Sequence, residues 1–321
     1  MFTPIRRLSL LTLLIIAFAA CGTTPAAQPP AAPTTPPSTA TPAAAITITD
    51  TLGRQVALDG PPARIVSLAP SVTEILFAIG AGPQVVGVTS FCNFPPEADA
   101  LPEVGGFSTR SISIEAIVGL EPDLVIAGAA SQQPVIEQLE QLAVPAAVLA
   151  PTNVEEVYAN IAQAGYLTGH VEQATAVVNE MRARIDAVTA KVATIPAEAR
   201  PTVYWEVYDD PLTTVGPTTF ISQLIELAGA TNSFADASED YPQVSAEAVF
   251  ARDPQVILGP DSQGPKLTPE VIAQRPGWAD VRAVRDRRIY LLDGDIVSRP
   301  GPRLADALET MAAVLYPEAF Q

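Results

Sequence analysis

The stretch SIEAIVGLEPDLVI, residues 113–126, returns later in the chain as SAEAVFARDPQVIL, residues 245–258, at an offset of 132 residues. In each copy a Ser precedes a short apolar helical pattern, and a Pro separates that pattern from an apolar strand. A weaker echo pairs residues 75–81 with residues 224–230. The offset is far longer than the periods of about 20–50 residues that mark solenoid repeats. The repeat therefore predicts two lobes built on the same plan.

Around the first copy, short apolar runs alternate with helical patterns. Such alternation is typical of a parallel sheet covered by helices on both faces, and the pattern resumes at residues 202–208. Residues 46–49 and 56–58 flank a turn and predict an opening hairpin. The predicted strands of the first lobe are residues 65–69, 85–89, 124–127 and 146–150, and the predicted helices are residues 72–79, 114–119 and 134–142.

A long amphipathic helix is expected between the two copies. Its apolar positions are spaced by three or four residues, so they form one stripe on a helix. They are Ala174, Val177, Met181, Ile185, Val188, Val192 and Ile195. With Pro196 as a stop, a helix over residues 171–195 would be about 37 Å long. The predicted fold is α/β: two lobes of central parallel sheet flanked by helices, over residues 46–150 and 200–321, joined by a helical connector over residues 151–199.

The N-terminus indicates export. Arg6 and Arg7 precede an apolar run over residues 8–20, which is too short to span a bilayer of about 30 Å. Small residues then lead to Cys21, as in a bacterial lipobox, where the Cys becomes lipidated; an ordinary cleaved signal is the alternative. Seven of residues 22–45 are Pro and none is charged, so this segment predicts a disordered tether. We expect a signal peptide over residues 1–20, a lipidated Cys and tether over residues 21–45, and an extracytoplasmic protein held at the membrane by its lipid.

Composition excludes several kinds of site. The chain has 321 residues, a net charge of −17, one His and two Cys. A strongly acidic surface argues against nucleic acid as a partner. One His and two Cys exclude a three-His metal cage and a zinc-finger ligand set. Because the chain also lacks a nucleophile elbow and a phosphate-binding glycine loop, it predicts no catalytic set, no metal site and no cofactor.

Several polar residues have structural interpretations. SVTE at residues 71–74 predicts a capping box, which assigns Glu74 to a helix start. His170 is interpreted as a solvated residue at the start of a helix. Cys92 is expected to be a free thiol that packs as a small apolar group, although its loop position leaves a ligand contact open. Glu115 and Glu247 each lie just after a Ser that can cap a helix, and a carboxylate is stabilised at such a helix start, which is a sufficient structural explanation for either residue alone. Their equivalent places in both lobes are explained equally well by a binding partner that has two-fold symmetry and basic sockets.

Aromatic and charged residues gather where strands are expected to end. In open α/β sheets ligands bind beyond the carboxyl ends of the strands, so these residues predict a cleft, although core packing would explain any single aromatic. The aromatics are Phe91, Phe94, Phe107, Tyr208 and Tyr241, and a Gly/Pro-rich stretch after the last strand adds Asp295, Arg299 and Arg303.

With these features the chain resembles the ABC-transporter substrate-binding lipoproteins that serve cobalamin, haem and ferric siderophores, over about residues 46–318. The telling stretches are residues 64–74, 86–88, 115–126 and 241–247, and the cobalamin-binding branch is the most similar. The resemblance implies a ligand pocket that includes Pro70, Phe91, Phe107, Tyr241, Asp295 and Arg299. It also implies that Glu115 and Glu247 dock to Arg residues of the membrane permease. The chain departs from the family at Gly128, where a Trp is expected after the third strand, and in lacking the disulfide that closes one lobe.

The resemblance implies a monomeric binding protein without enzymatic activity, which captures cobalamin or a related corrinoid between its lobes. Haem or a ferric siderophore is the alternative ligand, and Tyr208 or Tyr241 could then hold iron. A metal-cluster oxidoreductase with this lobe plan is disfavoured, because only Cys92 would remain as a cluster ligand. A surface protein used for adhesion is a third possibility.

Overall fold

A computed structural model describes residues 45–262 and 267–320. The export signal, Cys21 and nearly all of the tether lie outside the described residues, so those expectations stay predictions. The two lobes belong to one compact unit. No helix within the described part of the chain is long and apolar enough to cross a membrane.

The N-terminal lobe is built on a four-stranded parallel sheet in the order β4-β3-β5-β6. These strands are β3 (Ile65–Ser67), β4 (Val85–Gly87), β5 (Leu124–Ala127) and β6 (Ala146–Val148). The opening hairpin of β1 (Ile46–Thr49) and β2 (Gln55–Leu58) is present as predicted. The lobe's helices are α1 (Pro70–Ala78), α2 (Pro96–Asp99), α3 (Ile114–Gly119) and α4 (Gln133–Gln141).

The C-terminal lobe repeats this plan with the strand order β10-β7-β11-β12, again all parallel. In both four-stranded sheets the strand that comes first in the chain lies second in the sheet, with the next strand along the chain on one side and the third on the other. The strands are β7 (Thr202–Trp205), β10 (Thr231–Asn232), β11 (Val256–Pro260) and β12 (Ile289–Leu292), with a small hairpin of β8 (Tyr208–Asp209) and β9 (Leu212–Thr213). The helices are α7 (Phe220–Leu227), α8 (Ala246–Arg252), α9 (Pro269–Ala273), α10 (Arg282–Arg285), α11 (Gly294–Val297) and α12 (Leu304–Leu315).

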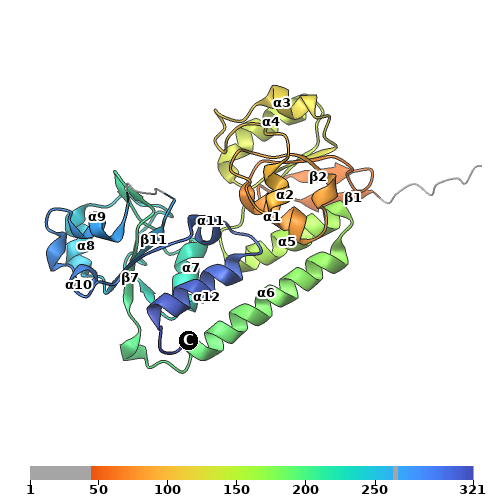
Figure 1. Ribbon diagram of the computed structural model, residues 1–321. Helices are drawn as coiled ribbons and strands as arrows, with labels where there is room; N and C mark the ends of the chain where they lie inside the picture. Colours follow the sequence, from red (N-terminus) through yellow and green to blue (C-terminus); the bar gives the residue numbers. More distant parts are fainter. Residues whose placement is uncertain (1–44, 263–266, 321) are drawn as a thin grey trace, which may run out of the picture. The chain divides into compact units, whose positions relative to one another are not determined.

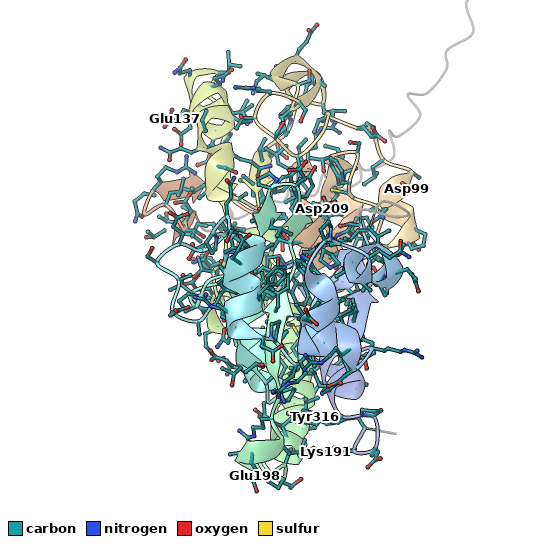
Figure 2. The ribbon with its side chains drawn as sticks, turned by 90° about the vertical axis from the view of Figure 1, so that its left-hand side faces the viewer. Asp99, Glu137, Lys191, Glu198, Asp209 and Tyr316 are labelled. Atoms are coloured by element: carbon teal, nitrogen blue, oxygen red, sulfur yellow. The ribbon has the colours of Figure 1, made fainter. Side chains whose placement is uncertain are left out.

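The predicted long helix is present as α6 (Val171–Val192), three residues shorter than expected at its end. It is paired with a second helix, α5 (Val154–Thr168), which also contacts α1 and β1 of the N-terminal lobe. Along its length α6 contacts α1 of the first lobe and α7 and α12 of the second (Figure 1). Figure 2 labels Lys191 and Tyr316 near the end of α6, where α12 also ends. The predicted stripe faces inward, because five of its seven residues are buried.

The apolar core has three parts. One cluster combines one face of both sheets with α5, α6 and α12, so the lobes share it. A second cluster fills the other face of the N-terminal sheet and is aliphatic. The third fills the corresponding face of the C-terminal sheet and contains Tyr204, whose ring centroid lies 5.8 Å from that of Phe234 and 6.1 Å from that of Trp278. The two lobes therefore share one apolar core, which is packed along α6.

Candidate functional site

A cavity of about 380 Å³ lies between the lobes at the carboxyl ends of the strands. The structure brings five of the predicted pocket residues together there: Pro70, Phe91, Phe107, Asp295 and Arg299. Ser71, Gly128, Ser262, Gly294, Ser298 and Pro300 complete the lining. The lining residues lie in the segments that follow β3, β4, β5, β11 and β12, so the cavity occupies the place where open α/β sheets bind ligands.

Gly128 follows β5 at the cavity wall and explains one departure from the family pattern. A Cβ added here would lie 2.4 Å from the Cβ of Ala69 and 3.2 Å from the side chain of Val72. The chain in front of α1 approaches too closely for any larger residue. The Trp that the family resemblance leads us to expect here therefore has no room at this position.

Two aromatic side chains give the cavity its apolar character. Phe91, in the loop after β4, is 56% exposed, and Phe107, before α3, is 37% exposed. Exposed aromatic rings at the wall of a cleft favour a ligand with flat apolar surface.

A buried glutamine positions this wall, and sequence reasoning missed it. The Gln132 side chain donates to the carbonyl of Phe107 at 2.9 Å and to that of Leu68 at 2.8 Å, and it accepts from Gly128 N at 3.1 Å. One amide group thus joins the ends of β3 and β5 to the loop that carries Phe107. No local motif could reveal this role, because the two carbonyls to which Gln132 donates lie 64 and 25 residues away in the chain.

Arg299 is occupied by partners within the protein. Its Nη1 donates to Glu74 Oε1 at 2.9 Å and to Asn93 Oδ1 at 2.8 Å, and its Nη2 donates to the carbonyl of Phe91 at 3.2 Å and to Asp295 Oδ1. All four Nη–H groups are therefore used. The predicted pocket arginine brings no free positive charge into the cavity.

The capping-box interpretation of Glu74 is wrong. Helix α1 begins at Pro70 with Ala69 as its N-cap residue and no side-chain cap, so Ser71 and Glu74 lie inside the helix. The Glu74 side chain is only 2% exposed and accepts two bonds from Arg303, at 2.9 and 2.6 Å, besides the one from Arg299. These contacts raise the pKa of Arg303. The motif cannot reveal that Pro70 starts the helix one residue before the Ser.

A second cavity, of about 440 Å³, lies beside this carboxylate. It is lined by Glu74, Phe77, Ala78, Phe94, Pro95, Glu97, Pro302 and Arg303. The Arg303 guanidinium lies over the ring of Phe94, 4.1 Å from its centroid. Glu74 and its arginines therefore stand close to both cavities.

Tyr208 and Tyr241 do not line the cavity between the lobes. They are about half exposed in the C-terminal lobe, where β8 pairs with β9 and Thr213 of β9 bridges to Gln243. Burial of the other half of Tyr241, together with the nearby Asp240 carboxylate, raises the pKa of Tyr241.

Glu206, directly after β7, forms a second buried ion pair that the sequence did not reveal. Both of its oxygens accept from Arg275 at 2.7 Å, and its side chain is fully buried. The two partners belong to the same lobe. This pair ties the end of β7 to the segment after α9.

Glu115 and Glu247 occupy equivalent places on α3 and α8. Ser113 Oγ accepts from Ala116 N at 3.1 Å, and Ser245 Oγ accepts from Ala248 N at 3.2 Å, so both predicted caps are present. Both carboxylates are exposed, and neither forms an ion pair with another described residue. Hydrogen bonding to its own backbone N–H, together with that from the Ser245 side chain, lowers the pKa of Glu247.

The remaining candidates have structural surroundings. Cys92 is buried and free, with its Sγ 3.2 Å from Thr89 Oγ1. His170 is the N-cap residue of α6 but makes no side-chain cap; its Nδ1 lies 3.0 Å from the carbonyl of Thr168, and the ring is partly buried rather than solvated. Within the described part of the chain, no group of three His, Cys, Asp or Glu residues could hold a metal ion.

Residues 65–296 match the family described as periplasmic binding protein. The chain belongs to this family. It is 31% identical to the uncharacterized ABC transporter substrate-binding lipoprotein YvrC of Bacillus subtilis over 281 residues, which cover 86% of this chain and 87% of YvrC. Membership makes it an extracytoplasmic substrate-binding protein of an ABC importer.

Solved structures of the family share the fold. The vitamin B12 binding protein BtuF of Vibrio cholerae is 29% identical with a TM-score of 0.69, covering 81% of this chain and 99% of BtuF. The heme-binding protein RhuT of Roseiflexus sp. RS-1 is 32% identical with a TM-score of 0.71, covering 80% and 99%. These likenesses confirm the two-lobed α/β architecture, and they include proteins named for different ligands.

Proposed function

We propose that the protein captures cobalamin, or a related corrinoid, in the cavity between the lobes and delivers it to the importer's permease. The character of the cavity carries this proposal. Phe91 and Phe107 offer flat apolar contact, the serine hydroxyls of the lining offer hydrogen bonds, and Arg299 is paired internally. A corrinoid is a broad disc rimmed by amides, so it matches an aromatic wall with a few polar groups and little net charge.

The same observations disfavour the other ligands of the family. An anionic siderophore would favour unpaired arginines, and Arg299 has none of its Nη–H groups free. Haem iron is held by His, Tyr, Cys or Met, and no such residue is among the described lining of the cavity. Haem remains the second candidate, because the relation to RhuT is as close as that to BtuF.

Titration of the purified mature protein with cyanocobalamin, haemin and a ferric hydroxamate tests the ligand. By isothermal calorimetry we expect cyanocobalamin to bind with a submicromolar Kd, about −8 kcal/mol or tighter, and the other two at least about tenfold more weakly. Tighter binding of haemin with a shifted Soret band would contradict the proposal. Tyr208→Phe and Tyr241→Phe would then identify the iron ligand.

We further propose that Glu115 and Glu247 dock to basic residues of a two-fold symmetric permease. Their support is the equivalent, exposed and unpaired position of both carboxylates. Exchange of both for Gln should abolish most ligand uptake by cells while leaving ligand binding intact. Glu137→Gln, an exposed carboxylate on α4 (Figure 2), is the matched control and should leave uptake unchanged. Uptake at the normal rate with both docking residues exchanged would contradict this assignment.

Lipid attachment at Cys21 is the remaining part of the proposal. Its support is the motif around Cys21 and the naming of YvrC as a lipoprotein. Cys21→Ser should release the protein from the membrane fraction of cells, as seen by immunoblotting. A protein that stays with the membrane after this exchange would overturn the assignment.

A further inference from the structure

The carboxylate of Glu74 joins the two lobes. Glu74 lies on α1 of the N-terminal lobe, whereas Arg299 and Arg303 lie between α11 and α12 of the C-terminal lobe (Figure 1). The two arginines donate three hydrogen bonds of 2.6–2.9 Å to its two oxygens. With side chains 2%, 10% and 16% exposed, the three groups form a buried cluster of charges that crosses the boundary between the lobes.

The loop that carries Phe91 is bound to the same cluster. Arg299 donates to the carbonyl of Phe91 and to Asn93 Oδ1, and Asn93 Nδ2 donates to Asp295 Oδ2 at 2.6 Å. Asp295 in turn accepts from Arg299. Phe91 at the cavity wall is therefore held by a guanidinium from the opposite lobe, and that guanidinium is held by Glu74.

The charges of this cluster balance. Glu74 and Asp295 supply two negative charges, and Arg299 and Arg303 supply two positive charges. Removal of one member of a buried cluster leaves the other charges uncompensated, which is far more costly than removal of an exposed pair. Loss of the Glu74 charge would leave two guanidinium groups of one lobe facing the other lobe without their shared anion.

We infer that Glu74 is a positioning residue of the ligand site: it holds Arg299 and Arg303, and through them it sets the separation of the lobes and the placement of Phe91. This inference rests on the proposed function only for its effect on ligand affinity. The effect on lobe separation stands on the contacts alone.

The test compares Glu74→Gln with Glu206→Gln. Both exchanges remove the charge of a buried glutamate bound to arginine, but the partner of Glu206, Arg275, belongs to its own lobe. Each protein also carries the exchanges Glu137→Cys and Ala251→Cys, at exposed positions of the N-terminal and the C-terminal lobe. Spin labels attached to these two cysteines report the distance between the lobes by double electron–electron resonance. Cyanocobalamin affinity is measured on the same proteins without labels.

For Glu74→Gln we expect a broader distribution of distances between the lobes and an increase in Kd of roughly tenfold or more. Glu206→Gln should lower the thermal midpoint to a similar degree without broadening the distribution. An unchanged distribution in Glu74→Gln, or equal broadening in both variants, would overturn the inference. If the wild-type protein binds no cobalamin, the ligand proposal fails while the distance measurement still decides the role of Glu74. If Glu74→Gln does not fold, the variant Arg303→Gln takes its place in the same comparison, because it removes two of the three hydrogen bonds to the Glu74 carboxylate.

Discussion

The two lobes share a strand order but differ where their first strand meets its first helix. In the N-terminal lobe, β3 leads almost directly into α1, so Pro70 and Ser71 reach the cavity wall. In the C-terminal lobe, residues 206–219 separate β7 from α7 and include the small hairpin with Tyr208. The two sheets have the same strand order, and the different connections between the first strand and the first helix make one wall of the cleft unlike the other.

The cores differ as well. The apolar cluster that belongs to the N-terminal lobe alone is aliphatic, whereas the one that belongs to the C-terminal lobe alone contains Tyr204, Phe234 and Trp278. Trp278 is almost fully buried, and Phe250 packs edge-on against it at 6.0 Å. The C-terminal cluster combines these rings with aliphatic side chains, whereas the N-terminal cluster has aliphatic side chains alone, so loss of one large ring should destabilise the protein more than loss of one methyl group.

The largest effect is expected from Trp278→Ala. Loss of this ring should lower the free energy of unfolding by about 3–5 kcal/mol, because it removes buried surface and leaves a cavity. Ile136→Val, at a fully buried site in the N-terminal cluster, should cost about 0.5–1.5 kcal/mol. Urea denaturation followed by circular dichroism measures both, and similar losses in the two variants would refute the contrast between the cores.

A smaller effect separates the two walls of the cleft. Phe91→Ala should weaken cyanocobalamin binding by about 5–30-fold, or about 1–2 kcal/mol, because Phe91 lines the cavity. Tyr241→Ala should weaken binding less, since Tyr241 lies outside that cavity. Calorimetric titration of both variants measures the difference. A larger loss for Tyr241→Ala would show that the C-terminal lobe supplies the main ligand contact.

The smallest effect concerns the helix starts that carry the equivalent glutamates. Ser113→Ala and Ser245→Ala should each cost about 1 kcal/mol of stability, because each removes an N-cap. The pKa of Glu247 is lowered in the folded protein, so its ionised form contributes stability above the ordinary carboxyl pKa, and that contribution is lost as the pH falls through the lowered value. NMR titration of the Glu247 carboxyl should show its pKa rising toward the ordinary value in Ser245→Ala. No change would mean that the backbone N–H of Glu247 alone lowers its pKa.

The regular part of the fold was predictable from the sequence. Strand β5 and helix α3 match their predicted ranges, and β3, β4, β6 and β7 end two or three residues earlier than expected. Apolar runs and Ser caps are local features of the sequence, so the elements that they mark can be predicted without knowledge of the tertiary structure. Helix α5 was not predictable as an element separate from α6 within the expected connector, because the regular apolar stripe belongs to α6.

The cleft was predictable only in part. The rule that ligands collect beyond strand ends, joined with the family resemblance, named Pro70, Phe91 and Asp295 before the structure placed them together. The groups that organise the cleft were not predictable, because their partners are distant in the chain. Gln132 binds a carbonyl 64 residues away, and Glu74 binds arginines 225 and 229 residues away.

Continuous contact of α6 with helices of both halves has a consequence for transport. Helix α6 is a continuous helix of 22 residues, and its buried side packs into the core that both lobes share. It therefore provides no hinge for a large change in the separation of the lobes. An importer that engages this protein must then tell the loaded form from the empty one by subtle displacements around the bound cargo, not by a gross rearrangement of its carrier.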